Sequence, residues 1–377
     1  SNFVPWQYVA QRTGATFATI PVDDQGDLVL EELDRIAQLG RVRVVAAGIC
    51  HTDIRAHAGG GIAVPRPIVL GHEGAGVIEA VGGAVQHLRP GDRVVLSGSS
   101  CGGCPSCRAN LPSYCDEVIA RSFGGQRVDG SSALSGADGR IHGHFFGQSS
   151  FATHCLADAR GAVRVDDDVP LHVAAPLGCG VITGAGTVLH AFDLRPGQSL
   201  VVIGAGSVGL SAVMAARLCG ASQVVAVDPL PARRAMALEL GATAVLDSAV
   251  DDLVAAVRGV LPRGADFALN TTALPAAYEA SLQVLGTRGT AAFVTAPAQP
   301  FTTRLQTLQF GGRSLRGIIG GDAAPQRTIP MLLDHWRRGR FPMDRLISTF
   351  DFDDIALAFE AARSGSVIKP VLRMAAP

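Results

Sequence analysis

Lysine is almost absent from this 377-residue chain, because Lys369 is its only lysine and all other basic residues are arginines. Charge of either sign is scarce as well: charged residues make up 17% of the chain, and the formal net charge is −1. Such a balance supplies no basic field for nucleic acid or for an anionic membrane. Aromatic residues, at 5%, are too few for base-stacking surfaces. The composition therefore predicts neither a nucleic-acid nor a membrane partner.

Charged residues are missing altogether from residues 169–192 and 196–216. Their length alone would suit membrane helices. The first stretch contains Pro170, Pro176 and many glycines, and the second contains a strand–turn–helix motif, so we interpret both as parts of a globular core. The N-terminus lacks a charged segment followed by an apolar one, so secretion is not indicated. We expect a cytoplasmic protein.

The length favours two domains, and a hydrophobic content of 47% supplies material for their cores. Residues 42–165 are rich in glycine, valine and short apolar runs broken by turns, a pattern typical of a small β-rich domain. Residues 199–318 alternate apolar strands with helices, which predicts a parallel sheet with helices on both faces. The predicted strands are residues 200–203, 223–228, 244–246, 267–270 and 290–294. After them we expect helices at 328–338 and 354–363 and a strand at 368–373.

A glycine motif follows the first strand of that alternating region and opens its first helix. In Gly204-x-Gly206-x-x-Gly209 the first glycine permits a tight turn, the second admits a pyrophosphate to the backbone, and the third lets helix and strand pack closely. The N-terminus of the helix, with Ser207 and Val208, then faces the anion. This context predicts a dinucleotide site.

Asp228 ends the next predicted strand, where a carboxylate would bind the adenosine ribose. A carboxylate there favours NAD, because it would repel the 2′-phosphate of NADP. Arg233 and Arg234 lie close by in the sequence and could accommodate such a phosphate. NAD is therefore the expected cofactor, and whether the protein also accepts NADP stays open.

Four of the eight cysteines lie in the run Cys101-x-x-Cys104-x-x-Cys107-x7-Cys115. Such crowding in a large, non-secreted chain indicates metal binding rather than disulfides. Four thiolates suit a closed, structural zinc site. The spacing is also close to that of some iron–sulfur proteins, so a cluster or paired disulfides remain alternatives on spacing alone.

A second metal site is indicated by three ligands that are far apart in the sequence. Cys50 lies in the run Cys-His-Thr-Asp, His72 in Gly-His-Glu-Gly, and Cys179 between two glycines. Three protein ligands with an open fourth position define a catalytic zinc site. A lone cysteine is commonly just a buried apolar residue, and a histidine beside a glutamate is often only a hydrogen-bonded pair.

These motifs together, in this order, resemble the zinc-dependent medium-chain alcohol dehydrogenases over about residues 42–373. Residues 144–158, which include Phe145-Phe146-Gly147-Gln148-Ser149, are most similar to the aryl-alcohol (benzyl alcohol) branch, as are residues 317–322, 339–342 and 367–370. The resemblance implies an α/β protein with a β-rich GroES-like catalytic domain (residues 41–180 and 320–377). It also implies a Rossmann nucleotide-binding domain with a doubly wound parallel sheet (residues 181–319).

The resemblance implies two zinc ions per chain and a role for each motif residue. Cys50, His72 and Cys179 would hold the catalytic zinc, and Asp53 and Glu73 would be carboxylates close to that metal, one of them fixing the His72 ring. The structural zinc would be held by Cys101, Cys104, Cys107 and Cys115.

The reaction implied is oxidation of a primary alcohol, aromatic or allylic, with hydride transfer to NAD. Thr52 would accept the proton of the substrate hydroxyl. His51 and Lys369 would lie near the pyrophosphate of NAD, and Asp228 and Arg233 near its ribose; His51 could equally be an ordinary surface histidine. The substrate pocket is predicted by position at Ser97, Phe145 and Val294.

Arg55 stands where many members of the family carry a relay histidine, so the route of the proton beyond Thr52 stays open. The alternatives to this function are a zinc polyol or amino-alcohol dehydrogenase and a zinc-stabilised, NAD-binding scaffold without turnover. A homodimer or homotetramer is expected by analogy, formed through the edge of the nucleotide-domain sheet.

Residues 1–40 do not resemble the start of this family. The stretch around Pro21-Val22-Asp23-Asp24 is instead similar to an internal fragment of pyridoxal-phosphate cysteine desulfurases. No desulfurase activity is implied, because the Schiff base of those enzymes needs a lysine and Lys369 lies far from the fragment. We treat residues 1–40 as an atypical N-terminal segment.

Overall fold

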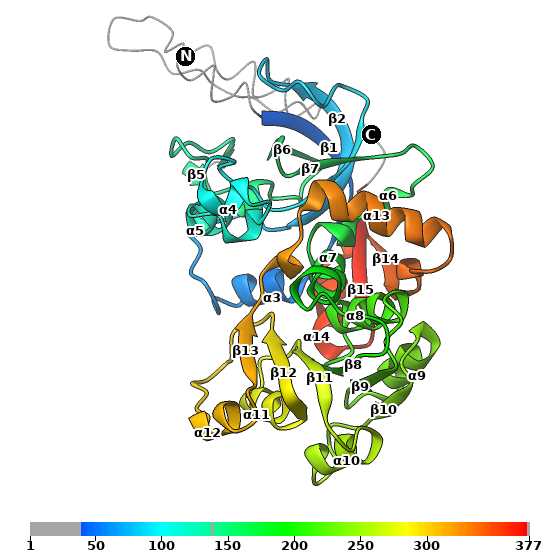
Figure 1. Cartoon of the computed structure of the whole chain (residues 1–377). Coiled ribbons are helices and arrows are strands. Elements are labelled where there is room, and N and C mark those ends of the chain that lie inside the picture. The colour runs from blue at the N-terminus through cyan, green and yellow to red at the C-terminus, as the bar shows by residue number, and fades with distance from the viewer. Residues whose placement is uncertain (1–38, 137–138, 375–377) are drawn as a thin grey trace, which may run out of the picture. The chain divides into compact units, whose positions relative to one another are not determined.

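The computed structural model describes residues 39–136 and 139–374, which form two compact units (Figure 1). The first unit comprises the described residues up to Cys179 and from Ile347 onward, and the second comprises Gly180–Leu346. The sequence analysis put the return to the first domain at residue 320. The structure groups residues 320–346 with the second unit, in which α13 (Pro325–Arg337) packs against α7 (Gly180–Gly186). The predicted desulfurase-like fragment lies outside the described residues.

A seven-stranded sheet forms the centre of the first unit. Its order is β14-β15-β1-β2-β3-β7, with β6 also paired to β1, and all pairs are antiparallel except β14–β15. The strands are β1 (Leu39–Gly48), β2 (Glu73–Val81), β3 (Arg93–Leu96), β6 (His154–Asp158), β7 (Ala162–Val165), β14 (Ile347–Asp351) and β15 (Lys369–Arg373).

The sequence of β1 explains how this sheet packs. Val42 and Val44 are buried, whereas Arg41 and Arg43 point the other way and lie 2.9 and 3.8 Å from Glu79 of β2. This alternation is the period of two that a half-buried strand requires. The buried face packs against Ala358 and Ala362 of α14 (Ile355–Ser364).

Short elements complete the first unit. The helices are α3 (His51–His57), α4 (Pro105–Arg108), α5 (Val118–Phe123) and α6 (Leu171–Ala174), and β4 (Leu134–Gly136) pairs antiparallel with β5 (Gly139–Ile141). The 3₁₀ turns are η1 (Pro112–Tyr114), η2 (Phe145–Gly147), η3 (Ala175–Gly178) and η7 (Phe352–Asp354).

The second unit is built on a six-stranded, wholly parallel sheet of order β10-β9-β8-β11-β12-β13. The predicted Rossmann-type parallel sheet is thereby confirmed. Every residue of β8 is buried, as expected of a central parallel strand covered on both faces. The strands are β8 (Ser199–Ile203), β9 (Gln223–Val227), β10 (Ala244–Leu246), β11 (Ala265–Asn270), β12 (Leu285–Phe293) and β13 (Ser314–Gly317).

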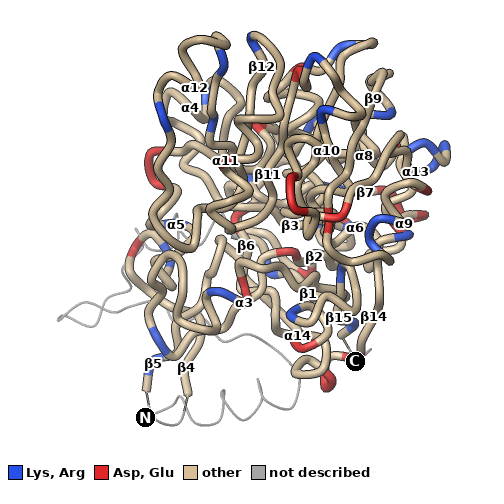
Figure 2. The backbone as a smooth tube through the Cα atoms, turned by 90° about the horizontal axis from the view of Figure 1, so that it is seen from below, with Lys and Arg blue, Asp and Glu red and all other residues tan. Residues whose placement is uncertain are grey.

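Helices connect these parallel strands, as right-handed crossovers require. They are α8 (Ser207–Leu218), α9 (Pro231–Leu240), α10 (Leu253–Val260), α11 (Pro275–Gln283) and α12 (Leu305–Gln309). The helix α7 and the π-helical turn η4 (Thr187–Ala191) precede β8, and η5 (Gly320–Asp322), α13 and the 3₁₀ turn η6 (Met343–Leu346) follow β13. Figure 2 shows acidic and basic residues interspersed along the described chain rather than gathered by sign.

The apolar stretch at residues 169–192 is folded into short pieces rather than one long helix. Within the described residues, no single helix has the length and apolar character needed to cross a membrane. One bent pair, Leu171–Gly178 with Gly180–Ala191, passes that test by length and composition only.

Candidate active site

Four side chains from three segments that are far apart in the sequence meet in the first unit. Cys50 precedes α3, His72 and Glu73 stand at the start of β2, and Cys179 follows η3. One ligand atom from each of the four lies within 4.8 Å of the others. The three ligands predicted for a catalytic zinc are therefore brought together, and Glu73 joins them.

Asp53 fixes the histidine of this cluster. Its Oδ1 lies 3.0 Å from His72 Nδ1 and accepts a hydrogen bond from the backbone N–H of Gly71 (3.1 Å), while Oδ2 accepts one from the N–H of Cys50 (3.0 Å). Asp53 and His72 are both fully buried. With Nδ1 held by the carboxylate, Nε2 is left for the cluster, and within the described residues this buried atom has no hydrogen-bond partner. A buried, unpartnered imidazole nitrogen oriented by a carboxylate fits a metal ligand.

The proton affinities in the cluster fit the same interpretation. A hydrogen bond from the Cys179 thiol lowers the pKa of Cys50 well below its usual value, and the same bond, together with burial, raises the pKa of Cys179. Burial opposes charging of His72, yet the carboxylate of Asp53 raises its pKa well above the usual value. Bound zinc would displace the protons that these groups share, because it binds the thiolate and the neutral ring.

Glu73 is engaged by the single lysine of the chain. Lys369 Nζ donates to both carboxylate oxygens, at 2.9 and 2.8 Å, and to the carbonyl of Ile49 at 3.2 Å. Burial raises the pKa of Glu73, and Lys369 acts in the opposite direction; burial likewise opposes the charge of Lys369, whose pKa Glu73 raises. Because this ion pair occupies Glu73, the donor set is two sulfurs and one imidazole with a fourth position open, which fits catalytic zinc.

The ammonium group of Lys369 is buried against Glu73, and its predicted place near the pyrophosphate of NAD stays a prediction. Only 2% of the residue is exposed, and the group points at Glu73. His51, at the start of α3, is exposed, and the hydroxyl of Thr52 lies 3.8 Å from Cys50 Sγ. Thr52 thus lies beside one of the proposed metal ligands, and its role as proton acceptor stays a prediction.

Aromatic rings cover one side of His72. The ring of Phe146 stacks on the imidazole with centroids 4.5 Å apart, and the edge of Phe145 meets it at 5.7 Å. Phe145, the predicted pocket residue, is fully buried with Ala56 and Leu70, whereas Phe146 keeps part of its surface exposed. We therefore place Phe146 rather than Phe145 in the proposed substrate wall. In the sequence, Phe146 was only one residue of a motif shared with the aryl-alcohol branch.

The backbone explains why the second phenylalanine takes this place. Phe146 has φ +52°, in the left-handed region that non-glycine residues rarely adopt, and His144 (φ +64°) and Gly147 (φ +74°) flank it. Of the other predicted pocket residues, Ser97 donates its hydroxyl to the carbonyl of Gly178 at 2.9 Å. Val294 directly follows β12, in the second unit.

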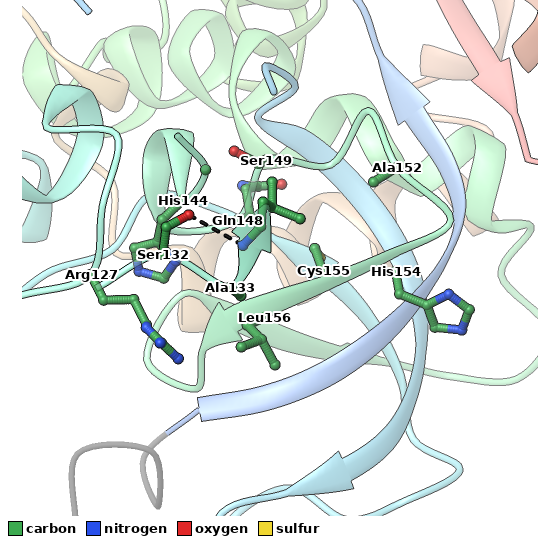
Figure 3. Close-up of a pocket in the computed structure, with 12 residues that line it drawn as sticks. Arg127, Ser132, Ala133, His144, Gln148, Ser149, Ala152, His154, Cys155 and Leu156 are labelled. Atoms are coloured by element: carbon green, nitrogen blue, oxygen red, sulfur yellow. Dashed lines mark hydrogen bonds between the residues drawn. The ribbon is translucent and has the colours of Figure 1, made fainter. Parts of the chain in front are cut away.

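A small cavity lies beside the turn that carries Phe146 (Figure 3). It measures about 50 Å³, room for one or two water molecules and too little for an alcohol substrate. Its walls include Gln148, Ser149 and His144, and burial lowers the pKa of His144 to about 4. None of the four cluster residues borders it, so it is separate from the proposed substrate site.

The four-cysteine run folds into a second metal-ready cluster. The sulfurs of Cys101, Cys104, Cys107 and Cys115 all lie within 4.8 Å of one another, and that of Cys101 is 3.9 Å from that of Cys107. A tetrahedron with Zn–S bonds of ~2.3 Å has edges of about 3.8 Å. The spacing therefore fits one metal ion and leaves no room for the multi-iron core that the sequence alone had kept open.

Backbone N–H groups point at these sulfurs. Cys101 Sγ accepts from Gly103 (3.4 Å) and Cys104 (3.3 Å), and Cys115 Sγ accepts from Cys101 (3.2 Å) and Glu117 (3.4 Å). Backbone N–H groups, that of Asp116 first, lower the pKa of Cys104 to about 6. Such donors stabilise thiolates, whereas burial raises the pKa of Cys107 to about 12 and that of Cys115 above its usual value, so the four thiols do not all favour the charged form without a metal ion.

The glycine motif of the second unit lies where the sequence put it, between β8 and α8. Gly204 has φ +97°, and a Cβ there would lie 2.4 Å from Thr271 Oγ1. A Cβ on Gly209 would lie 1.9 Å from the carbonyl oxygen of Gly204, whereas beside Gly206 nothing lies within 4 Å. The turn is thus closed on the sheet side and open at Gly206, which fits a pyrophosphate at the N-terminus of α8, where Ser207 and Val208 stand. Thr271, which donates to the carbonyl of Gly204 at 2.9 Å, supports the turn and carries no sequence signal.

Asp228 is anchored at the end of β9. Its carboxylate accepts hydrogen bonds from the N–H groups of Ala205 (2.8 Å) and Leu230 (2.9 Å), and 3% of the residue is exposed. Arg233 Nη1 lies 3.9 Å from Asp228 Oδ2. Arg234 donates instead to the carbonyl of Asp228 and lies 3.0 Å from Asp247. Of the two arginines, Arg233 is the one beside the proposed ribose carboxylate.

Comparison with known proteins matches both units. The sequence matches the model of the alcohol dehydrogenase GroES-like domain over residues 38–167 and that of the zinc-binding dehydrogenases over residues 207–336. Geraniol dehydrogenase of Castellaniella defragrans is 46% identical over 371 residues, covering 97% of this chain and 96% of that protein. That match reaches into residues 1–40.

Solved structures give the same result. An alcohol dehydrogenase zinc-binding domain protein from Burkholderia ambifaria superposes with a TM-score of 0.87 at 45% identity, and benzyl alcohol dehydrogenase from Acinetobacter calcoaceticus with 0.86 at 40%. Each match covers 90% of this chain and 92% of the other.

Proposed function

Because the chain belongs to the zinc-dependent medium-chain alcohol dehydrogenases, as its motifs predicted, we propose that it oxidises an aromatic or allylic primary alcohol to the aldehyde, reversibly, with NAD as the hydride acceptor. The single observation that carries this proposal is the cluster of Cys50, His72 and Cys179, with the unpartnered Nε2 of His72 beside the flat ring of Phe146. The names of two relatives, geraniol dehydrogenase and benzyl alcohol dehydrogenase, support this substrate class.

The chemistry is divided between the bound groups and the side chains. When bound, zinc supplies Lewis-acid stabilisation of negative charge on the alcohol oxygen, and NAD accepts the hydride. Thr52 relays the hydroxyl proton of the substrate: its oxygen accepts that proton as it gives up its own, so the Thr52 hydroxyl stays neutral. Asp53 holds the His72 ring so that Nε2 stays directed at the metal. The exposed part of the Phe146 ring, beyond its contact with His72, packs against an aryl ring or a double bond, which orients the reacting carbon.

A substrate panel with zinc analysis tests the function. Benzyl alcohol and geraniol should reduce NAD with kcat/KM at least ~100-fold above ethanol and sorbitol, because the smaller or more polar alcohols forgo contact with the apolar wall. The same sample should contain two zinc ions per chain. Preference for sorbitol would instead indicate a polyol dehydrogenase, and one zinc without turnover would indicate a scaffold.

Cofactor choice should depend on Asp228. Asp228→Asn removes the charge that would bind the ribose hydroxyls, so the KM for NAD should rise about 10-fold or more, and NADP should become a better substrate with Arg233 unopposed. Steady-state kinetics with both cofactors measures the change. Asp247→Asn is the matched control, since Asp247 pairs with Arg234 and makes no bond to the glycine turn. Equal KM values for NAD in the two variants would contradict this role of Asp228.

We further propose that the protein forms a homodimer or homotetramer in the cytoplasm. β13 is an edge strand of the six-stranded sheet, and Leu305, Phe310 and Ile319 near it in sequence are 74%, 85% and 53% exposed. Exposed apolar groups beside an edge strand favour association. The six thiols of the two proposed sites bind metal only when reduced, which favours a reducing compartment.

A further inference from the structure

The segment that follows Phe146 makes hydrogen bonds that the proposed reaction does not account for. Residues 148–151, here called the clamp segment, donate hydrogen bonds to four successive carbonyl groups, those of residues 69–72. Ser149 Oγ donates to Val69 (2.6 Å), the N–H of Phe151 to Leu70 (3.0 Å), the N–H of Ser150 to Gly71 (2.9 Å), and Gln148 Nε2 to His72 (3.1 Å). The clamp segment thus lies along the chain that carries His72 and holds it by two backbone and two side-chain donors.

Gln148 completes this pattern at the histidine itself. Its Nε2 donates to the carbonyl of His72, and its Oε1 accepts from the N–H of Gly74 at 3.0 Å. Only 2% of the residue is exposed. A Cβ on Gly74 would lie 2.9 Å from Gln148 Oε1, so glycine is what lets the amide approach. One side chain therefore holds the main chain on both sides of Glu73.

The same amide also reaches the chain that leads to Cys179. Gln148 Nε2 lies 3.4 Å from the carbonyl of Ser97, and the hydroxyl of Ser97 donates to the carbonyl of Gly178 at 2.9 Å. Gly178 directly precedes Cys179, and a Cβ there would lie 2.2 Å from the carbonyl oxygen of Leu96, so the two segments are in close contact. A continuous path of hydrogen bonds therefore joins the residue of one proposed ligand to the neighbour of another.

We propose that Gln148 is a positioning residue that sets the spacing between His72 and Cys179, and thereby the geometry of the catalytic metal site. The proposal rests on the metal site of the proposed function. An amide is required because one side chain must offer an acceptor to the N–H of Gly74 and donors to two carbonyls. Methionine has the same length and offers neither, whereas ionised glutamate offers only the acceptor.

The test is zinc release from the purified holoenzyme to a chromophoric chelator, which resolves the two metal sites by rate. Partners that orient metal ligands typically contribute 10- to 100-fold to metal affinity. Gln148→Met should therefore release one of its two zinc ions about 10- to 100-fold faster than wild type, with release from the four-cysteine site unchanged. Gln148→Glu should lie between the two. In cobalt-substituted protein, the absorption bands of the catalytic site should shift in Gln148→Met.

Gln126→Met is the matched control, because Gln126 lies in the same unit and its side chain accepts one bond, from Arg140 at 3.0 Å, far from the cluster in sequence. If Gln148→Met showed the zinc release rates and cobalt bands of the wild type, the positioning role of Gln148 would be overturned. The proposed function would still stand if the wild type held two zinc ions and turned over substrate. If Gln148→Met fails to fold, Gln148→Glu decides by the same two measurements. A wild-type protein with zinc only at the four cysteines would overturn both.

Discussion

Cys50→Ser should lose at least ~10³-fold in kcat, together with one of two zinc ions. Cys50 supplies one of the two sulfurs of the proposed catalytic site, and a Lewis-acid metal contributes several kcal/mol to the stabilisation of the developing charge. Binding of NADH should survive, because the glycine turn and Asp228 belong to the second unit, which contains none of the catalytic ligands. Steady-state kinetics, zinc analysis and NADH fluorescence on one preparation measure all three quantities.

Cys219→Ser provides the control for this variant. Cys219 is half-buried in the second unit and belongs to neither cysteine cluster, so its replacement should leave kcat and the zinc content unchanged. The assignment of Cys50 would be refuted by an undiminished kcat in Cys50→Ser, or by a loss of zinc that left kcat intact.

Lys369→Met should destabilise the first unit by about 3–5 kcal/mol, since it removes the ammonium group from a carboxylate that is fully buried. Burial already raises the pKa of Glu73, so the carboxyl can take up a proton and avoid part of the cost. Replacing both partners, in Lys369→Met with Glu73→Gln, should recover much of the loss, because no buried charge then remains. Urea unfolding of the metal-free protein measures these values without a contribution from bound zinc.

A neighbouring ion pair on the same strand gives the matched comparison. Arg373 Nη2 lies 2.9 Å from Asp351, and both side chains are largely exposed, at 55% and 70%. Arg373→Met should therefore cost no more than about 1 kcal/mol. If Lys369→Met lowered the free energy of unfolding as little as Arg373→Met, the buried pair would contribute no more to stability than the exposed one.

The sequence alone determined the local parts of this protein. The strand Ala244–Leu246 begins and ends where the pattern predicted it, and the predicted strand at 200–203 lies within β8 (Ser199–Ile203). The glycine turn and the four-cysteine loop were recognisable because each is a short run of characteristic spacing, although only the distances between the four sulfurs showed that they fit a single metal ion. Cys50, His72 and Cys179 were recognisable by their residue types within small, characteristic runs.

Contacts between distant residues required the tertiary structure. The ammonium group of Lys369 binds the carboxylate of Glu73, 296 residues away in the chain, and no local pattern predicts that partner. Phe146 rather than Phe145 stacks on the imidazole of His72, because the backbone there adopts left-handed conformations. Two consecutive phenylalanines in the sequence do not predict such conformations. The hydrogen bonds of Gln148 form only because the clamp segment packs along residues 69–74. Periodicity and spacing encode neighbours within a few residues, whereas the partner of a buried polar group is decided by which remote segments pack around it.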